Sequence, residues 1–157
     1  MPHPKDIDIQ IHIEQPVDRV FDAWLRPALL ERWLTEKAVV DPSVGGAYEL
    51  FWDPENPEKN STRGCRITDL VKNSEISFNW RGPDQYDDVM GDKTHVFIRL
   101  ESSEGGTLLR FIHTGWGRGQ EWEDARRWQY EAWKDAIENL KNMLETTQKF
   151  LKGVSFN

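Results

Sequence analysis

Apolar and polar residues alternate at the start of the chain. Isoleucine occupies positions 7, 9, 11 and 13, and Asp8, Gln10 and His12 lie between them. This two-residue period is typical of a strand with one face in the core and the other in water. The segment from 7 to 13 is therefore predicted to be a half-buried strand.

Two short helices are predicted after this strand. Pro16 suits the first turn of a helix, where its missing N–H costs nothing, and apolar residues follow at helical spacing up to Trp24. Pro27 starts the second helix in the same way, and this helix carries Leu30 and Trp33.

Six further strands are predicted before the last part of the chain, at residues 37–40, 47–52, 63–71, 75–80, 94–100 and 107–113. A polar loop with two prolines, 53–60, and a longer loop, 81–92, interrupt them. The segment 102–106 reads Ser-Ser-Glu-Gly-Gly, which is a hairpin signal between the last two strands.

One long amphipathic helix is predicted from roughly residue 120 to 148. Its inward stripe contains Trp122, Ala125, Gln129, Trp133, Ala136, Leu140, Met143 and Leu144. A meander of antiparallel strands with one long helix to cover its apolar face is an α+β architecture. All 157 residues are expected to form a single domain.

Composition and charge exclude several functional classes. The net charge of −7 argues against nucleic acid as a partner, because phosphate binding needs clustered lysine and arginine, and it disfavours an anionic membrane surface. No apolar run is long enough to span a bilayer. The first residues lack an apolar signal segment, and the single Cys65 cannot form an internal disulfide, so we expect a cytoplasmic protein.

Three motifs that suggest a cofactor fail on their spacing. Residues 115–119, Gly-Trp-Gly-Arg-Gly, do not match a nucleotide-binding loop and are expected to form a flexible rim. The acidic segment 84–92 lacks the glycine and glutamate positions of a calcium-binding loop. The four histidines show no metal-ligand spacing, so neither a metal nor another cofactor is predicted.

The predicted long helix carries the most informative polar residues. Stepping about 100° per residue from Trp122 places Arg126 and Gln129 on the inward stripe, whereas the inward positions from Ala132 onward are all apolar. Burying a charge in a dry core costs several kcal/mol, so these residues indicate a ligand cavity beside this half of the helix. The alternative is that Arg126 reaches outward or pairs with a carboxylate such as Glu49.

His113 is the one weak candidate for catalysis. It shares its strand phase with Leu109 and Phe111 and is expected to point inward. A lone inward histidine is more often a hydrogen-bonded core residue than a catalyst. No serine or cysteine nucleophile stands out, so the sequence favours a binding protein over an enzyme.

A series of short sequence features runs from about residue 7 to residue 145. They are Arg32-Trp33, Gly45-Gly46-Ala47-Tyr48, Gly64, Ile76-Ser77-Phe78-Asn79-Trp80, Gly106-Thr107, His113-Thr114-Gly115-Trp116, and Trp133 with Ile137 and Leu140. In this order they resemble the Hsp90-ATPase-activator-homologue-1-like branch of the START/Bet v 1-like helix-grip (SRPBCC) superfamily. The resemblance implies a curved antiparallel sheet wrapped around the C-terminal helix, with a cavity between them. It also implies that small apolar molecules are bound or transformed there.

These observations lead us to expect a cavity that binds a small hydrophobic or aromatic molecule. The predicted ligand-binding residues are Trp33, Trp52, Phe78, Trp80, His113, Trp116, Trp122, Arg126, Gln129 and Trp133.

Two other functions stay open at this point. One is a cyclase- or hydrolase-type enzyme that uses His113 as an acid or base in the same pocket. The other, implied by the resemblance alone, is a module that regulates a chaperone ATPase. The Hsp90 activator itself carries a further domain, so this chain alone is not expected to stimulate that ATPase. The oligomeric state, a homodimer included, is also open.

Overall fold

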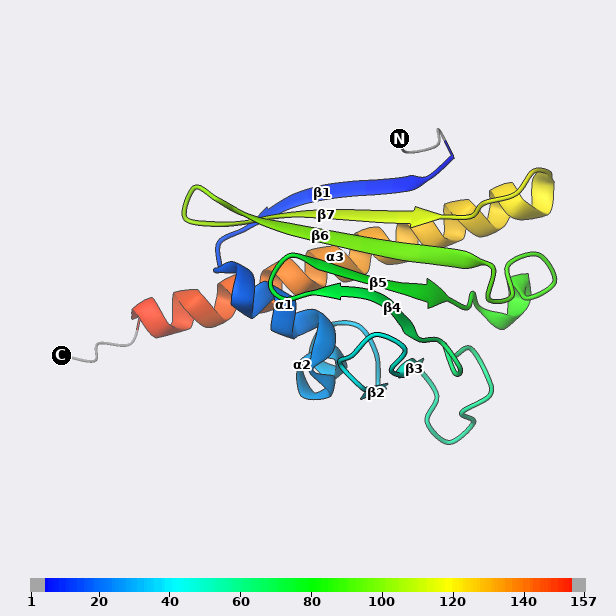
Figure 1. Cartoon of the computed structure of the whole chain (residues 1–157), viewed down its shortest axis with the longest axis horizontal. Coiled ribbons are helices and arrows are strands. Elements are labelled where there is room, and N and C mark those ends of the chain that lie inside the picture. Colours follow the sequence, from blue (N-terminus) through cyan, green and yellow to red (C-terminus); the bar gives the residue numbers. More distant parts are fainter. Residues whose placement is uncertain (1–4, 154–157) are drawn as a thin grey trace.

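The computed structural model describes the backbone of residues 5–153 and the side chains of residues 5–146. Figure 1 shows the strands layered against one long helix. The elements are, in chain order, β1 (Ile7–Ile13), α1 (Val17–Leu25), α2 (Pro27–Trp33), β2 (Lys37–Val40), β3 (Tyr48–Phe51), β4 (Ile67–Val71), β5 (Glu75–Trp80), the 3-10 turn η1 (Asp84–Tyr86), β6 (Thr94–Ser103), β7 (Gly106–Thr114) and α3 (Gln120–Gly153). The predicted α+β fold class is confirmed.

Five of the strands form one antiparallel sheet in the order β1-β7-β6-β5-β4, and β2 pairs with β3 in a separate sheet. Two isolated antiparallel bridges, Ala47 with Arg66 and Phe51 with Ser61, connect the smaller sheet to the chain before β4. Along β7 every second side chain from Thr107 to His113 is buried, as the alternating pattern requires. The strand register sets Trp80 opposite Thr94 and His113 opposite Val96, so both pairs lie near the same end of the sheet.

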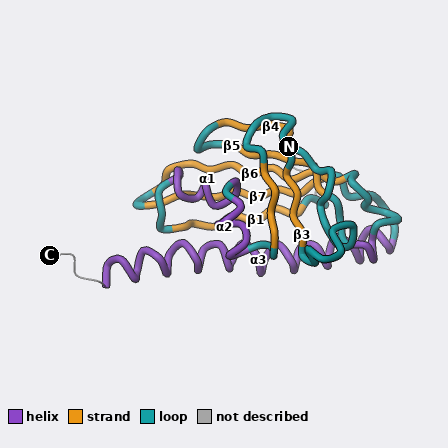
Figure 2. The backbone as a smooth tube through the Cα atoms, turned by 90° about the horizontal axis from the view of Figure 1, so that it is seen from below, coloured by secondary structure: helices purple, strands orange, loops and turns teal. Residues whose placement is uncertain are grey.

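Helices α1 and α3 pack on the same face of the larger sheet, and α2 packs against both of them. Trp24 of α1 packs against Trp33 of α2, and its ring also stacks on Phe111 of β7. Trp133 of α3 lies against the same phenylalanine, with 4.5 Å between the ring centroids. Figure 2 shows α3 running along one side of the strands. Burying each of these large rings contributes about 1.5–3 kcal/mol, so this aromatic cluster is the centre of the core.

The break between α1 and α2 follows from Pro27. The residue before a proline is disfavoured in the helical region, and Arg26 is extended, with φ −87° and ψ 121°. Carbonyls near the end of α1 then need other donors. The Trp33 indole N–H donates to the Ala23 carbonyl at 2.9 Å, and the Tyr48 hydroxyl donates to the Trp24 carbonyl at 2.6 Å.

Several predicted boundaries are wrong, and the strand predicted at 94–100 continues to Ser103. The strand predicted at 63–71 begins only at Ile67, because Gly64 has a φ of +88° and the Cys65 N–H donates to the Thr62 carbonyl in a turn. The last helix extends past 148 to Gly153. Over residues 5–153, no helix combines the length and the apolar character that a membrane span needs.

Candidate functional site

A cavity of about 640 Å³ lies between the first half of α3, the end of β5 and the loops that follow β3 and β5. This volume falls in the range of small-molecule sites, about 300–1,000 Å³. Its lining residues are Leu34, Trp52, Asn60, Trp80, Arg81, Gly82, Pro83, Asp84, Gln85, Trp128, Gln129, Ala132, Trp133 and Ala136.

The cavity has a buried floor and an exposed rim. Trp80, Gln129 and Trp133 form the floor, with at most 4% of each residue exposed. The Trp80 and Trp133 rings lie 4.8 Å apart between centroids and present indole surface to the cavity. Trp52 and Trp128 stand at the rim, 39% and 42% exposed. The cavity is therefore aromatic from its mouth to its deepest point.

Hydrogen bonds within the protein occupy the indole N–H groups of three of these tryptophans. Trp133 donates to His113 Nδ1 at 3.1 Å, Trp80 donates to Gln129 Oε1 at 3.1 Å, and Trp52 donates to the Leu34 carbonyl at 2.9 Å. These bonds fix the orientations of the rings. They leave apolar ring surface, rather than N–H donors, to meet whatever enters the cavity.

His113 holds the floor from behind and does not line the cavity. Because an indole can only donate, His113 Nδ1 must accept from Trp133, so the proton lies on Nε2, which donates to Thr94 Oγ1 at 2.8 Å. The Thr94 hydroxyl in turn donates to the Trp80 carbonyl at 3.4 Å. Burial, with a smaller contribution from the nearby His95, lowers the pKa of His113 to about 3. The imidazole is therefore neutral near pH 7, and both of its nitrogens are engaged.

Two loops meet at the rim through a reciprocal pair of hydrogen bonds. The Asn60 N–H donates to Asp84 Oδ1 at 3.2 Å, and the Asp84 N–H donates to Asn60 Oδ1 at 2.9 Å. Arg81, also in the lining, pairs with Asp87 at 3.1 Å. The rim thus carries charged groups, and the arginine already has a carboxylate partner.

Four of the ten predicted site residues line the cavity: Trp52, Trp80, Gln129 and Trp133. Trp33 and Phe78 lie in the hydrophobic core instead. Trp116 and Trp122 pack edge to face on each other, with 6.1 Å between ring centroids, and the Trp116 indole donates to the His113 carbonyl at 2.9 Å.

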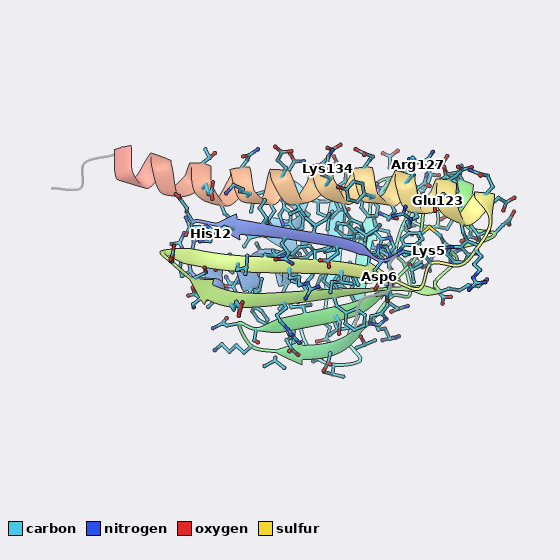
Figure 3. The ribbon with its side chains drawn as sticks, turned by 90° about the horizontal axis from the view of Figure 1, so that it is seen from above. Lys5, Asp6, His12, Glu123, Arg127 and Lys134 are labelled. Carbon is cyan, nitrogen blue, oxygen red and sulfur yellow. The ribbon has the colours of Figure 1, made fainter. Side chains whose placement is uncertain are left out.

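Arg126, the remaining predicted residue, pairs within its own helix. Its guanidinium lies 2.8 Å from Glu123 Oε1 and is absent from the cavity lining. The pairing with Glu49 is not observed, since Glu49 Oε2 accepts the Gly64 N–H. The bond from Arg126 and the charge of Lys5 both hold the pKa of Glu123 below its usual value. Figure 3 shows Lys5, which precedes β1, and Glu123, in the first turn of α3, at the same end of the molecule.

Most of the rim and part of the wall were not predicted from the sequence. Trp128, Asn60 and the segment 81–85 belong to the lining, and so do Ala132 and Ala136 of α3. The two alanines fall on the predicted inward stripe, and their small side chains beside Gln129 leave space that larger residues would fill. Residues 81–85 reach the site because β5 ends there at Trp80, and Asn60 lies beside them through its hydrogen bonds with Asp84. Among the described residues, no group of three or more His, Cys, Asp or Glu side chains is placed to hold a metal ion.

The model of a protein family described as "Activator of Hsp90 ATPase homolog 1-like protein" matches residues 14–145. A crystal structure of a Mesorhizobium loti protein is similar to this chain, with a TM-score of 0.74, 23% identity and coverage of 90% of this chain and 98% of that one. The Aha1 dimer from Colwellia psychrerythraea, solved in solution, has a TM-score of 0.69 at 19% identity, covering 89% and 96%. A crystal structure of a Chromobacterium violaceum protein has a TM-score of 0.68 at 25% identity, and the match covers 91% of this chain and 99% of that one. No curated protein matches the chain.

Proposed function

Because the chain belongs to the activator of Hsp90 ATPase homolog 1-like family, a helix-grip fold, we propose that the cavity beside α3 binds a small hydrophobic or aromatic molecule. The observation that carries this proposal is the floor, where Trp80 and Trp133 are almost completely buried and both indole N–H groups are used within the protein. Such a surface offers ring faces for stacking and apolar contact. A small apolar ligand matches both the chemistry and the volume of this cavity.

Binding is favoured over catalysis by the position and the protonation of His113. A general base must reach the proton it abstracts and must have a pKa near the working pH. His113 does not line the cavity, and its lowered pKa of about 3 makes it a poor proton acceptor at neutral pH. The proposal therefore assigns His113 to the support of Trp133 and not to a reaction.

Filling the cavity from α3 tests the proposal. Ala132 is part of the lining, so Ala132→Phe should place a ring in the space that the ligand would occupy. Native mass spectrometry of freshly purified wild-type protein should show a co-purifying small molecule that the variant lacks. Titration with N-phenyl-1-naphthylamine, an apolar fluorescent probe, should show saturable binding to the wild type and at least tenfold weaker binding to Ala132→Phe.

Asn139→Phe is the matched control, because Asn139 lies exposed on the same helix outside the cavity. It should bind the probe as the wild type does. Equal probe binding by Ala132→Phe and wild type, or no probe binding by wild type, would contradict the proposal.

A cytoplasmic location and a homodimer are also part of the proposal. The single cysteine, Cys65, is buried and free, and burial raises its pKa to about 12, which suits a structural thiol in a reducing compartment. Support for the dimer comes from the Aha1 relative, which was solved as a dimer. Sedimentation velocity at two concentrations that differ tenfold tests the dimer, and a single monomeric species at both would contradict it.

A further inference from the structure

The Gln129 side chain has one settled hydrogen bond in the cavity floor. The Trp80 indole N–H, which can only donate, lies 3.1 Å from the Gln129 amide, so the atom facing it must be the oxygen Oε1. This contact fixes which way the amide is turned. The Nε2 group, with two N–H donors, therefore points away from the Trp80 nitrogen.

The Nε2 group of Gln129 is open to the cavity. Within the described residues it makes no hydrogen bond, and the side-chain polar atoms that are both sealed from solvent and unpaired are Trp24 Nε1 and Arg126 Nε. Nε2 is therefore not sealed, although Gln129 as a whole is only 3% exposed. Because Gln129 belongs to the lining, the surface that Nε2 retains is cavity surface.

We infer that the molecule bound in this cavity carries a neutral hydrogen-bond acceptor, of the carbonyl type, which receives the Gln129 Nε2–H at the buried end of an aromatic or apolar body. This inference rests on the proposed function. The N–H groups of Trp80 and Trp133 are already used, so the glutamine amide is the donor that the floor offers. A ligand without an acceptor would displace water from this amide and leave its N–H groups without a hydrogen bond, which is unfavourable.

The charges near the cavity favour a neutral acceptor over a carboxylate. A carboxylate beside Gln129 would be desolvated against two indoles with a single neutral amide to receive it, which is strongly unfavourable. The cation in the lining, Arg81, already pairs with Asp87, and Asp84 adds a negative charge at the rim. An aromatic ketone or amide therefore fits this site better than an aromatic acid.

A pair of probes of nearly equal shape tests the inference on the intact protein. The two probes are 2-acetylnaphthalene and 2-isopropylnaphthalene, and the carbonyl oxygen of the first takes the place of one methyl group of the second. Isothermal titration calorimetry gives the Kd of each. In Gln129→Leu the Kd of the ketone, divided by the Kd of the alkyl probe, should rise about threefold to tenfold, because one neutral hydrogen bond to the ketone is lost. Asn139→Leu, which removes an exposed amide from the same helix, should leave the ratio unchanged.

A measurement on wild-type protein alone covers the case in which Gln129→Leu does not fold. The Gln129 side-chain amide signals in a ¹H–¹⁵N correlation spectrum should move with the ketone and stay in place with the alkyl probe. An unchanged Kd ratio in Gln129→Leu, or equal shifts with both probes, would overturn the inference while leaving the proposed function standing. If 2-naphthoate bound more tightly than the ketone, the site would prefer a carboxylate, and the inference of a neutral acceptor would be overturned. Failure of both neutral probes to bind would remove the proposed function and this inference together.

Discussion

At the scale of single residues, His113 joins the sheet to the helix above it. Its ring accepts from Trp133 of α3 and donates to Thr94 of β6, and its complete burial keeps it neutral. The sequence predicted the inward orientation from strand phase. The two hydrogen-bond partners were not predictable, because they lie 20 and 19 residues away on different elements.

This burial predicts a loss of stability in mild acid. Between about pH 6.5 and pH 3 the unfolded chain binds a proton on this imidazole and the folded chain does not, so protonation favours unfolding in that window. The free energy of unfolding should fall by about 1.4 kcal/mol per pH unit from this group as the pH is lowered. Urea titrations at several pH values measure this slope.

His113→Gln should be less stable at neutral pH but should lose this part of the slope. His12→Gln is the control, because His12 is only partly buried and lies at the other end of β1 from Ile7, the residue that pairs with His113. The same pH slope in wild type and His113→Gln would show that His113 is not the group responsible.

Arg126 supplies the second prediction at this scale. Its side chain is 29% exposed and its partner Glu123 38% exposed, so the pair resembles a surface ion pair. Arg126→Leu should lower Tm by less than about 4 °C and should leave the binding of N-phenyl-1-naphthylamine unchanged within twofold. A fall of about 10 °C or more would indicate a buried ion pair, and a large change in binding would place Arg126 in the site.

At the scale of elements, the end of α1 depends on a side chain from β3. The helix must stop before Pro27, and the Tyr48 hydroxyl then satisfies the Trp24 carbonyl in a buried environment. The sequence predicted the break from the proline alone. It did not predict the tyrosine as the compensating donor, because β3 reaches α1 only through the packing of the smaller sheet.

Tyr48→Phe should lower the free energy of unfolding by about 1–3 kcal/mol, since it leaves a buried carbonyl without its donor. Chemical denaturation measures the change. Tyr130→Phe removes a hydroxyl from an exposed tyrosine of α3 and should stay within about 0.5 kcal/mol of wild type. Equal effects of the two substitutions would mean that the Tyr48 bond contributes nothing of its own.

At the scale of the whole molecule, a ligand in the cavity should couple α3 to the sheet and the rim loops. Occupation at about 100 times Kd adds about 2.7 kcal/mol to the stability of the folded state. For a chain of this length that corresponds to a rise in Tm of about 5–10 °C. Differential scanning fluorimetry with 2-acetylnaphthalene measures it, with Ala132→Phe as the variant that should not respond. An unchanged Tm in wild-type protein would contradict binding of this probe to the folded state.

The sequence by itself determined the elements and the buried face of most of them. Residue periods of two and 3.6 are local, so the isoleucines of β1, the prolines before α1 and α2 and the inward stripe of α3 were readable without tertiary contacts. The same stripe put Gln129 on the inner face.

Tertiary structure alone decided what each inward side chain meets. Gln129 bonds to Trp80, 49 residues away, whereas Arg126, on the same stripe, finds Glu123 one turn back and leaves the cavity. The helical period predicts only the direction in which a side chain leaves the helix. The choice between a cavity wall and a nearby carboxylate depends on side-chain length and on loops that the period does not describe.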